Sequence, residues 1–386
     1  MDKTVYFDNN ATTPVNIEVF KAMEPFYKEE YGNASSIHAK GRVARHAVDN
    51  ARHIIAVSIG ASDEDIIFTS GGTESDNIAI KGAVLANSAK GNHIITSDTE
   101  HSAVLATCKF LEKSGCKVTY LGVDKYGIVS PDALKKAITD KTVLITIMHA
   151  NNETGTVNSI KDLAKIAKEN KILFHTDAVQ SFGKLEINVN DISVDMFSAS
   201  GHKIYGPKGI GILYIRKGVK IIPLTHGGYH ERNLRAGTEN VSCIVGFAKA
   251  IELAGIDRAK KNKALIALRD RLHKGLTRDI EDVYLNGHLT ERLPGSLNLS
   301  FRYIEGESIM LNLDIQGVCV STGSACTSGT LEPSHVLTAM GVPVDVAQGS
   351  IRFSLGEQNT AEEVDYCISI MPEIIKRLRA MSPLKK

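Results

Sequence analysis

The stretch TVLITIMHANNETGTVNSIKDLAKIAKENKILFHTDAVQSFGK, residues 142–184, decides the fold class. It contains an apolar run at residues 142–149, a helical segment that opens at residues 159–162 (SIKD), and a second apolar run at residues 172–175. A hydroxyl followed three residues later by an acid is typical of a helix start. Because a helix between two apolar strands is the repeating unit of a parallel sheet, this stretch predicts one such unit.

The same alternation of strand, loop and helix extends over about residues 63–216. Apolar strands are predicted at residues 66–69, 93–96, 142–149, 172–175, 196–199 and 210–215. Helices fill most of the intervals, and one of them opens at Ser130-Pro131, with proline at the first helical position. This pattern predicts an α/β fold with a mostly parallel sheet that carries helices on both faces.

The texture of the sequence changes after about residue 255. A charged helical segment covers residues 258–278, and a final helix opens with a capping box from Thr360 to Glu363. We therefore expect two domains. The larger would comprise residues 14–255, and a smaller α+β domain would combine residues 1–13 with residues 256–386.

Composition excludes several classes of partner. The 45 Lys and Arg residues balance 44 Asp and Glu residues, so charge gives no reason to expect nucleic acid or a membrane surface as a partner. The first residues carry acids where a signal peptide has its apolar core, and no apolar run is long enough to span a bilayer. Six scattered cysteines without a CxxC pair favour reduced thiols in a cytoplasmic protein.

Polar residues follow five of the predicted strands in succession. In open α/β sheets, ligands bind beyond the carboxyl ends of the strands, so these residues sample the expected site. They are Gly71-Gly72-Thr73, Glu100-His101, Asn151-Asn152-Glu153, Asp177 with Gln180, and Ser200-Gly201-His202-Lys203. A phosphate-type loop, an imidazole, an amide, a carboxylate and an amine together indicate one site.

Each of these residues has a plainer interpretation when it stands alone. Residues 71–73 could bind an anion at a helix start, or could form an ordinary tight turn. Lys203 follows an apolar strand, where a neutral amine could form a Schiff base, although most lysines lie on the surface. Asp177 could pair with a protonated pyridine nitrogen, as in pyridoxal-phosphate sites, or could cap the next segment.

Two further residues stand out in the second half of the chain. Cys326 lies among small residues at 321–330, which suits a thiol that must move between partners, although an incidental cysteine in a turn fits equally. Arg352 lies in an apolar strand and requires a carboxylate, from a substrate or from a structural aspartate. His226 and His230 are separated by glycines that disfavour a helix, so we expect no metal site.

Taken together, these segments resemble the cysteine desulfurases of the NifS/IscS type, which are class V aminotransferase-like enzymes of fold type I. The matching blocks are residues 6–13 (YFDNNATT), 70–81 (SGGTESDNIAIK), 99–104 (TEHSAV), 151–155 (NNETG), 175–184 (HTDAVQSFGK), 200–211, 226–241, 323–334 and 350–356. The resemblance implies a seven-stranded sheet, the cofactor pyridoxal 5'-phosphate (PLP) and a homodimer.

The resemblance also implies a role for each residue around the cofactor. Lys203 would carry PLP covalently, and His101 would stack on its ring and move protons. Asp177 would pair with the ring nitrogen, while Gln180 and Asn152 would contact the phenolic oxygen and the substrate. The phosphate would be bound by Gly72, Thr73, Ser200, His202 and, from a second subunit, Thr238.

By the same resemblance, Arg352 with Asn152 would bind the carboxylate of L-cysteine. Cys326 would take the substrate sulfur as a persulfide, leaving L-alanine, and pass it to an iron–sulfur scaffold protein or another acceptor. The alternatives are a selenocysteine lyase or another class V PLP reaction such as transamination. A plain aminotransferase has no use for Cys326, and an intact Lys203 and Asp177 argue against a non-catalytic binding protein.

Overall fold

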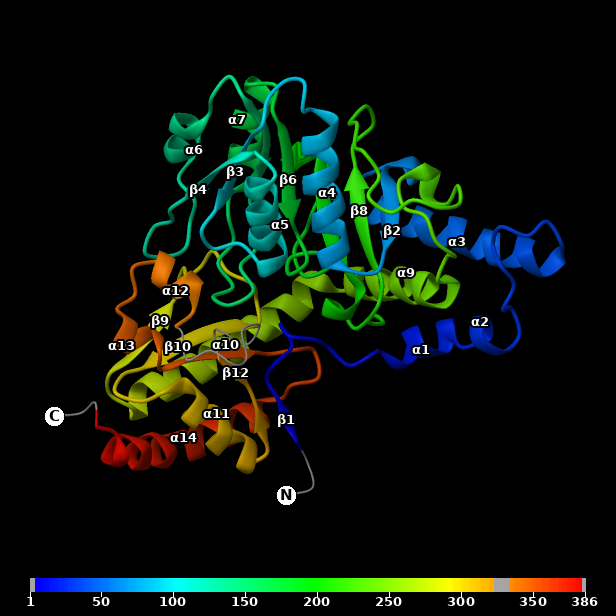
Figure 1. Cartoon of the computed structure of the whole chain (residues 1–386). Coiled ribbons are helices and arrows are strands. Elements are labelled where there is room, and N and C mark those ends of the chain that lie inside the picture. Colours follow the sequence, from blue (N-terminus) through cyan, green and yellow to red (C-terminus); the bar gives the residue numbers. More distant parts are fainter. Residues whose placement is uncertain (1–3, 323–332, 384–386) are drawn as a thin grey trace.

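A computed structural model describes residues 4–322 and 333–383 of the chain. The chain folds into a large lobe and a smaller one, which lies below it in Figure 1. No helix within the described residues combines the length and the apolar character that a membrane crossing requires.

The large lobe is built on a seven-stranded sheet with the strand order β2-β8-β7-β6-β5-β3-β4. The strands are β2 (Ile66–Thr69), β3 (His93–Ser97), β4 (Lys117–Leu121), β5 (Thr142–Thr146), β6 (Leu173–Asp177), β7 (Met196–Ser200) and β8 (Gly211–Ile215). Only β8 runs antiparallel to its neighbours in this sheet. The predicted α/β fold with a mostly parallel, seven-stranded sheet is confirmed.

Helices cover both faces of this sheet, as predicted. Neighbouring strand residues point to opposite faces, so Leu144 packs into the core under α4 and α5, whereas Ile145 packs into the core under α3, α7 and α9. The helices of the large lobe are α1 (Ile17–Met23), α2 (Pro25–Lys28), α3 (Ala39–Ser58), α4 (Gly72–Ala86), α5 (Ser102–Lys113), α6 (Pro131–Ala137), α7 (Ile160–Glu169), α8 (Val189–Ile192) and α9 (Val241–Gly255). Short 3-10 turns are η1 (Asp63–Asp65), η2 (Gly201–Lys203) and η3 (Glu231–Asn233).

The smaller lobe contains an antiparallel sheet in the order β12-β13-β10-β9. Its elements, with a separate two-stranded pair β1-β11, are β1 (Val5–Tyr6), α10 (Arg258–Asp279), β9 (Val283–Asn286), β10 (Ser296–Phe301), α11 (Gly306–Ile315), β11 (Val318–Cys319), β12 (Ser321–Thr322), α12 (His335–Ala339), α13 (Val344–Ala347), β13 (Ser350–Ser354) and α14 (Ala361–Met381). Val5 and Phe7 lie in the same hydrophobic core as the buried side chains of α10, β10, α11, β13 and α14. The division into domains at residue 255 stays a prediction. A small domain that combines residues 1–13 with residues 256–386 would need such a shared core.

The predicted strands differ from the observed ones at two places. The strand expected at residues 142–149 ends at Thr146, although Ile147 and His149 still donate backbone hydrogen bonds to the carbonyl groups of β6. The edge strand β4 was not predicted. Its residues (KVTYL) are mostly half-buried rather than buried, and Lys117, Thr119 and Tyr120 interrupt any continuous apolar run in the sequence there.

Candidate active site

The predicted site residues from β6 and β7 meet at the carboxyl edge of the large sheet. Asp177 is the last residue of β6, and Lys203 ends the turn η2 directly after β7. The Lys203 Nζ donates hydrogen bonds to the backbone carbonyl groups of Asn10 (2.6 Å) and Ala11 (2.7 Å). The lysine therefore points into the molecule, toward the N-terminal segment that joins the two lobes.

His101 lies beside Asp177 at this edge. A ring nitrogen of His101 and carboxylate oxygens of Asp177 and Asp76 lie within 4.8 Å of one another. His101 caps α5, because its Nδ1 accepts a hydrogen bond from the Ala103 N–H (3.1 Å), so the neutral ring carries its proton on Nε2. Burial lowers the pKa of His101, and the neighbouring Lys203 charge acts in the same direction.

Asp177 is a buried carboxyl group at the centre of the site. Its Oδ1 accepts a hydrogen bond from the Val179 N–H (2.8 Å), so it does cap the following turn. Burial raises the pKa of Asp177, while His101 and Lys203 counteract this rise. A cation placed against Asp177 would stabilise its ionised form, and both interpretations of this residue from the sequence remain compatible with its surroundings.

The glycine loop predicted at residues 71–73 lies at the start of α4. Gly71 has φ +152° and ψ −178°, a backbone conformation that only glycine adopts readily. A side chain on Gly72 would lie 2.5 Å from Val179 Cγ2, and one on Gly71 would lie 3.8 Å from Ser200 Oγ. The N-terminal end of α4 thus packs against the loop after β6 and faces the buried Ser200.

His202 is the next predicted phosphate ligand. Its Nδ1 lies 3.1 Å from Thr12 Oγ1. Burial lowers the pKa of His202 to about 4. The ring is therefore neutral near pH 7, and it can offer an anion a hydrogen bond but no charge.

The remaining predicted residues on this side of the sheet meet around Asn10. Gln180 Nε2 donates to the Asn10 carbonyl group (2.9 Å), and Asn10 Nδ2 donates to the Asn152 carbonyl group (3.3 Å). Arg352, buried in β13, donates through Nη1 to the same Asn152 carbonyl (3.2 Å) and pairs through Nη2 with Asp8 Oδ1 (2.8 Å). The structural aspartate considered for Arg352 is therefore present.

Two predicted residues lie apart from this group. Thr238 is exposed and lines a separate cavity of about 260 Å³ together with Ser70, Gly209 and Arg235 of the same chain. Cys326 lies outside the residues that the structure describes.

Comparisons with known proteins show which family the chain belongs to. The family model described as aminotransferase class-V matches residues 5–367. The chain is 56% identical over 386 residues to a cysteine desulfurase IscS of Dictyoglomus turgidum, covering 100% of this chain and 98% of the relative. It is 57% identical over 383 residues to a cysteine desulfurase IscS of Methanosarcina thermophila, covering 99% and 95%.

Solved structures give the same result. A NifS-like protein superposes with a TM-score of 0.92 at 43% identity, covering 97% of this chain and 100% of the other. A structure described as SspA in complex with cysteine superposes with a TM-score of 0.83 at 39% identity, covering 92% and 100%. This chain belongs to the cysteine desulfurases of the class-V aminotransferase family. The resemblance that the sequence motifs indicated is confirmed.

Several residues of this cysteine desulfurase site had no assigned role from the sequence. Asp76 and Glu100 are two further buried carboxyl groups near Asp177. One oxygen of each lacks a hydrogen-bond partner within residues 4–322 and 333–383. Burial raises the pKa of both carboxyl groups, in Glu100 to about 8. Both residues lie in matching blocks, Glu100 in residues 99–104 and Asp76 in residues 70–81, but no local pattern sets either of them apart.

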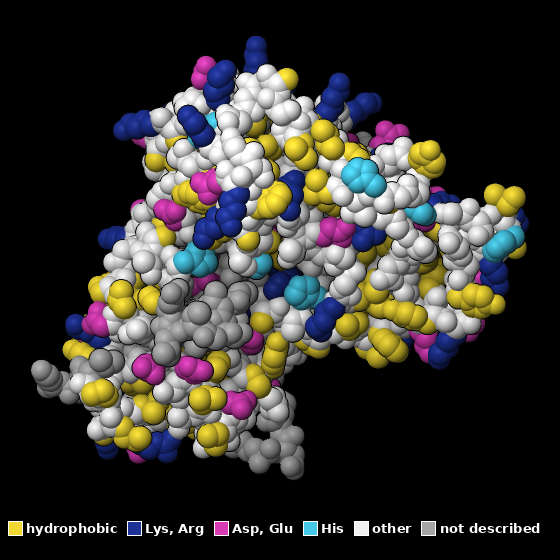
Figure 2. Space-filling model, viewed as in Figure 1, with side chains coloured by type: hydrophobic (Ala, Val, Ile, Leu, Met, Phe, Trp, Pro, Cys, Tyr) yellow, Lys and Arg dark blue, Asp and Glu magenta, His cyan; other side chains and the backbone are white. Residues whose placement is uncertain are grey.

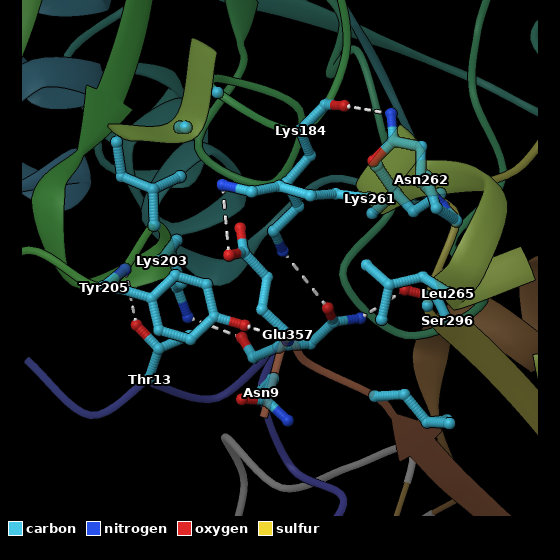
Figure 3. Close-up of a pocket in the computed structure, with 18 of the residues that line it drawn as sticks. Asn9, Thr13, Lys184, Lys203, Tyr205, Lys261, Asn262, Leu265, Ser296 and Glu357 are labelled. Carbon is cyan, nitrogen blue, oxygen red and sulfur yellow. Dashed lines mark hydrogen bonds and ion pairs between the residues drawn. The ribbon is translucent and has the colours of Figure 1, made fainter. Parts of the chain in front are cut away.

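Asn10 and Lys184 were also missed as site residues, although both lie in matching blocks. Figure 3 shows Lys184 and Lys203 at a pocket between the lobes, where Tyr205 and Asn9 also lie. This pocket encloses a cavity of about 50 Å³. The contacts of Asn10 and Lys184 join segments that are far apart in the sequence, so only the folded chain reveals them.

Proposed function

We propose that this cysteine desulfurase uses PLP to remove sulfur from L-cysteine, releases L-alanine and holds the sulfur as a persulfide on Cys326. The observation that carries the proposal is the convergence of an amine, an imidazole and a buried carboxyl group at one sheet edge. Lys203, His101 and Asp177 supply these groups. An aminotransferase would use this amine, imidazole and carboxyl group without a cysteine. The role of Cys326 therefore separates desulfuration from transamination.

The residues at the sheet edge fit PLP. Asp177 is buried where a protonated ring nitrogen would supply the cation that this carboxylate requires. The glycine backbone at 71–72, Thr73, Ser200 and His202 offer a helix start and neutral donors to a phosphate. PLP, when bound, accepts the electrons released as the substrate Cα loses its proton.

The chain's own residues then account for binding and proton movement. Lys203 would carry the Cα proton, and His101 would hold the substrate sulfur through a hydrogen bond from its Nε2–H, because its Nδ1 accepts the Ala103 N–H. The thiolate of Cys326 would attack the substrate sulfur, so that an S–S bond forms as the Cβ–S bond breaks. The electron pair left at Cβ would take the proton released by the outer sulfur of the persulfide, and Lys203 would return the proton to Cα, which gives L-alanine and the persulfide anion of Cys326.

Arg352 would bind the substrate carboxylate. Its Nη2 is occupied by Asp8, but its Nε has no hydrogen-bond partner within the described residues and is buried. A buried guanidinium donor without a partner costs free energy, and a carboxylate oxygen would satisfy it. Asn152 would assist from the loop after β5.

We also propose that the enzyme is a homodimer in which Thr238 reaches the phosphate of the second subunit. Figure 2 shows hydrophobic side chains over α1 and α2, a surface without cover in the single chain. The large hydrophobic residues that are exposed between positions 17 and 37, on α1, α2 and the loop after α2, are Ile17, Phe20, Tyr27, Tyr31 and Ile37. We call these five residues the α1–α2 surface. Exposed apolar groups of this number indicate a protein interface.

We place the reaction in the cytoplasm, with an iron–sulfur scaffold protein or another persulfide acceptor as the partner. Cys108, Cys116, Cys243, Cys319 and Cys367 are all free thiols, which fits a reducing compartment.

A matched pair of cysteine variants tests the function. We expect Cys326→Ala to keep the colour of bound PLP but to release no sulfide from L-cysteine under reductant. Cys319→Ala, a neighbouring cysteine in β11, should keep both the colour and the turnover. Unchanged sulfide release by Cys326→Ala would remove the proposed role of this thiol, and a wild-type protein that takes up no PLP would remove the proposed function itself.

A further inference from the structure

Lys184 lies in the site, but neither the fold nor the proposed reaction has yet given it a role. Its half-buried side chain enters the pocket that also contains Lys203 (Figure 3). Its Nζ donates hydrogen bonds to Gln180 Oε1 (3.1 Å) and to Asn10 Oδ1 (3.4 Å). Both partners are neutral amide oxygens.

Within the described part of the chain, no carboxylate forms an ion pair with the Lys184 amine. None of the ion pairs within residues 4–322 and 333–383 includes it, and the acid in the same pocket, Glu357, pairs with Lys261 (3.1 Å). Burial, together with the charges of Lys203 and Arg352, lowers the pKa of Lys184 to about 7. A lysine without an acid is an unfavourable neighbour for a second lysine, so a structural ion pair does not explain its position.

The contact with Gln180 fixes which way its carboxamide points. Because Lys184 Nζ donates to Gln180 Oε1, this oxygen faces the amine, and the Gln180 NH₂ group faces the other side. One of the two N–H groups meets the Asn10 carbonyl (2.9 Å), and the second remains available for the cofactor. A flipped amide would present an oxygen to the Asn10 carbonyl and to any cofactor oxygen.

We propose that Lys184 is a positioning residue of the cofactor site, which orients the Gln180 carboxamide as a donor and keeps a second amine next to Lys203. The inference rests on the proposed function, because the group that receives the Gln180 donor is the phenolic oxygen of PLP. Both effects of Lys184 should lower the pKa of the proton shared between Lys203 and the cofactor. A donor to that oxygen and a neighbouring positive charge both weaken the hold on the proton shared between Lys203 and the cofactor.

The charged groups around Lys184 come from several elements. They are Lys203 of η2, Arg352 of β13, Arg258 and Lys261 of α10, and Glu357 after β13. Lys261 provides a matched control. It lines the same pocket, but its Nζ binds Glu357 and the Leu253 carbonyl (2.9 Å) rather than Gln180 or Asn10.

The experiment compares Lys184→Met with Lys261→Met in the PLP-loaded protein, without substrate. The readout is the pH at the midpoint of the change in the visible absorption band. We expect Lys184→Met to raise this midpoint by about half a pH unit or more, because the proton is then held more tightly. Lys261→Met should leave it at the wild-type value. An equal midpoint in wild type and Lys184→Met would overturn the inference, even if the variant melts at a lower temperature.

A double-mutant cycle with Gln180→Ala tests the route. If Lys184 acts through Gln180, the shift in the double variant should be smaller than the sum of the two single shifts. Fully additive shifts would contradict the positioning role.

The outcome for Lys184 is separable from the outcome for the proposed function. A wild-type protein with a PLP band and no shift in Lys184→Met rejects the Lys184 role alone, whereas a wild-type protein without a band rejects both.

Discussion

Glu100 is fully buried next to His101. Its Oε1 accepts hydrogen bonds from Ser97 Oγ (2.7 Å) and the Met148 N–H (2.8 Å), while its Oε2 has no partner within the described residues. Two donors do not offset complete burial, and the pKa of Glu100 rises to about 8. The carboxyl group is therefore mostly protonated at neutral pH, and it adds little negative charge beside Asp177.

This protonation predicts a pH-dependent effect of Glu100→Gln. The folded pKa of Glu100 lies above its unfolded value, so the folded state binds more protons and the wild type loses stability as pH rises from about 4.5 to about 8. Glutamine cannot ionise. We expect the free energy of unfolding of Glu100→Gln, relative to wild type, to increase by roughly 3 kcal/mol between pH 5 and 8. Urea unfolding at several pH values measures this, and a difference that stays constant with pH would contradict it.

Asp177 shows the opposite relation between stability and function. Because burial raises the pKa of Asp177, its ionised side chain destabilises the protein without PLP. An ion pair with the proposed protonated ring nitrogen would offset this destabilisation. We expect Asp177→Asn to keep the hydrogen bond from the Val179 N–H and to raise the melting temperature of the PLP-free protein. The same variant should bind PLP more weakly. Thermal unfolding with and without PLP checks both effects, and an Asp177→Asn variant with wild-type PLP affinity would argue against the pairing.

At the scale of the element, local signals in the sequence succeeded where a helix end is determined by its own residues. Ser130 caps α6, and Thr360 and Glu363 form the predicted capping box at the start of α14. The edge strand β4 (KVTYL) was missed because polar residues interrupt its apolar pattern, and the end of β5 was placed too late because the apolar run continues through Ile147 and Met148.

The α14 capping box gives a prediction about stability. Thr360 Oγ1 accepts a hydrogen bond from the Glu363 N–H (3.3 Å), and Glu363 Oε2 accepts one from the Thr360 N–H (3.2 Å). We expect Thr360→Ala to lower the free energy of unfolding by about 1 kcal/mol, because the Glu363 N–H in the first turn of α14 loses its hydrogen-bond acceptor. Thr277→Ala, within α10 on an exposed face, is the control and should change stability by less than about 0.5 kcal/mol. Equal effects of the two variants, measured by chemical unfolding, would show that the cap is not important.

At the scale of the whole molecule, the site joins the two lobes through the segment at residues 8–13. Asn10 receives Lys203 and Gln180 from the large lobe, and its own N–H and amide groups donate to Ser354 and Ser296 of the small lobe. The strand-end rule predicted the residues after β6 and β7, because each follows its own strand. It could not predict Asn10, whose partners lie 142 or more residues away in the chain.

The α1–α2 surface provides the prediction about assembly. Phe20 is 54% exposed and Ile37 is 92% exposed, and both belong to a group of five exposed apolar residues, as expected at an interface, whereas a single exposed apolar residue is ordinary. We expect the double variant Phe20→Glu/Ile37→Glu to shift the protein from dimer to monomer, because each buried charge would need a partner that a second copy does not supply.

Ile315→Glu, at the end of α11 in the other lobe, is the control for this assembly test, because Ile315 is 78% exposed and lies outside the α1–α2 surface. Light scattering coupled to size exclusion would measure the mass of each variant, and the visible band would report PLP retention. If Thr238 completes the phosphate site of the second subunit, the monomeric variant should also lose PLP faster than the control. A double variant that stays dimeric would place the interface elsewhere, and a monomer that retains PLP as the wild type does would leave Thr238 without a role across the interface.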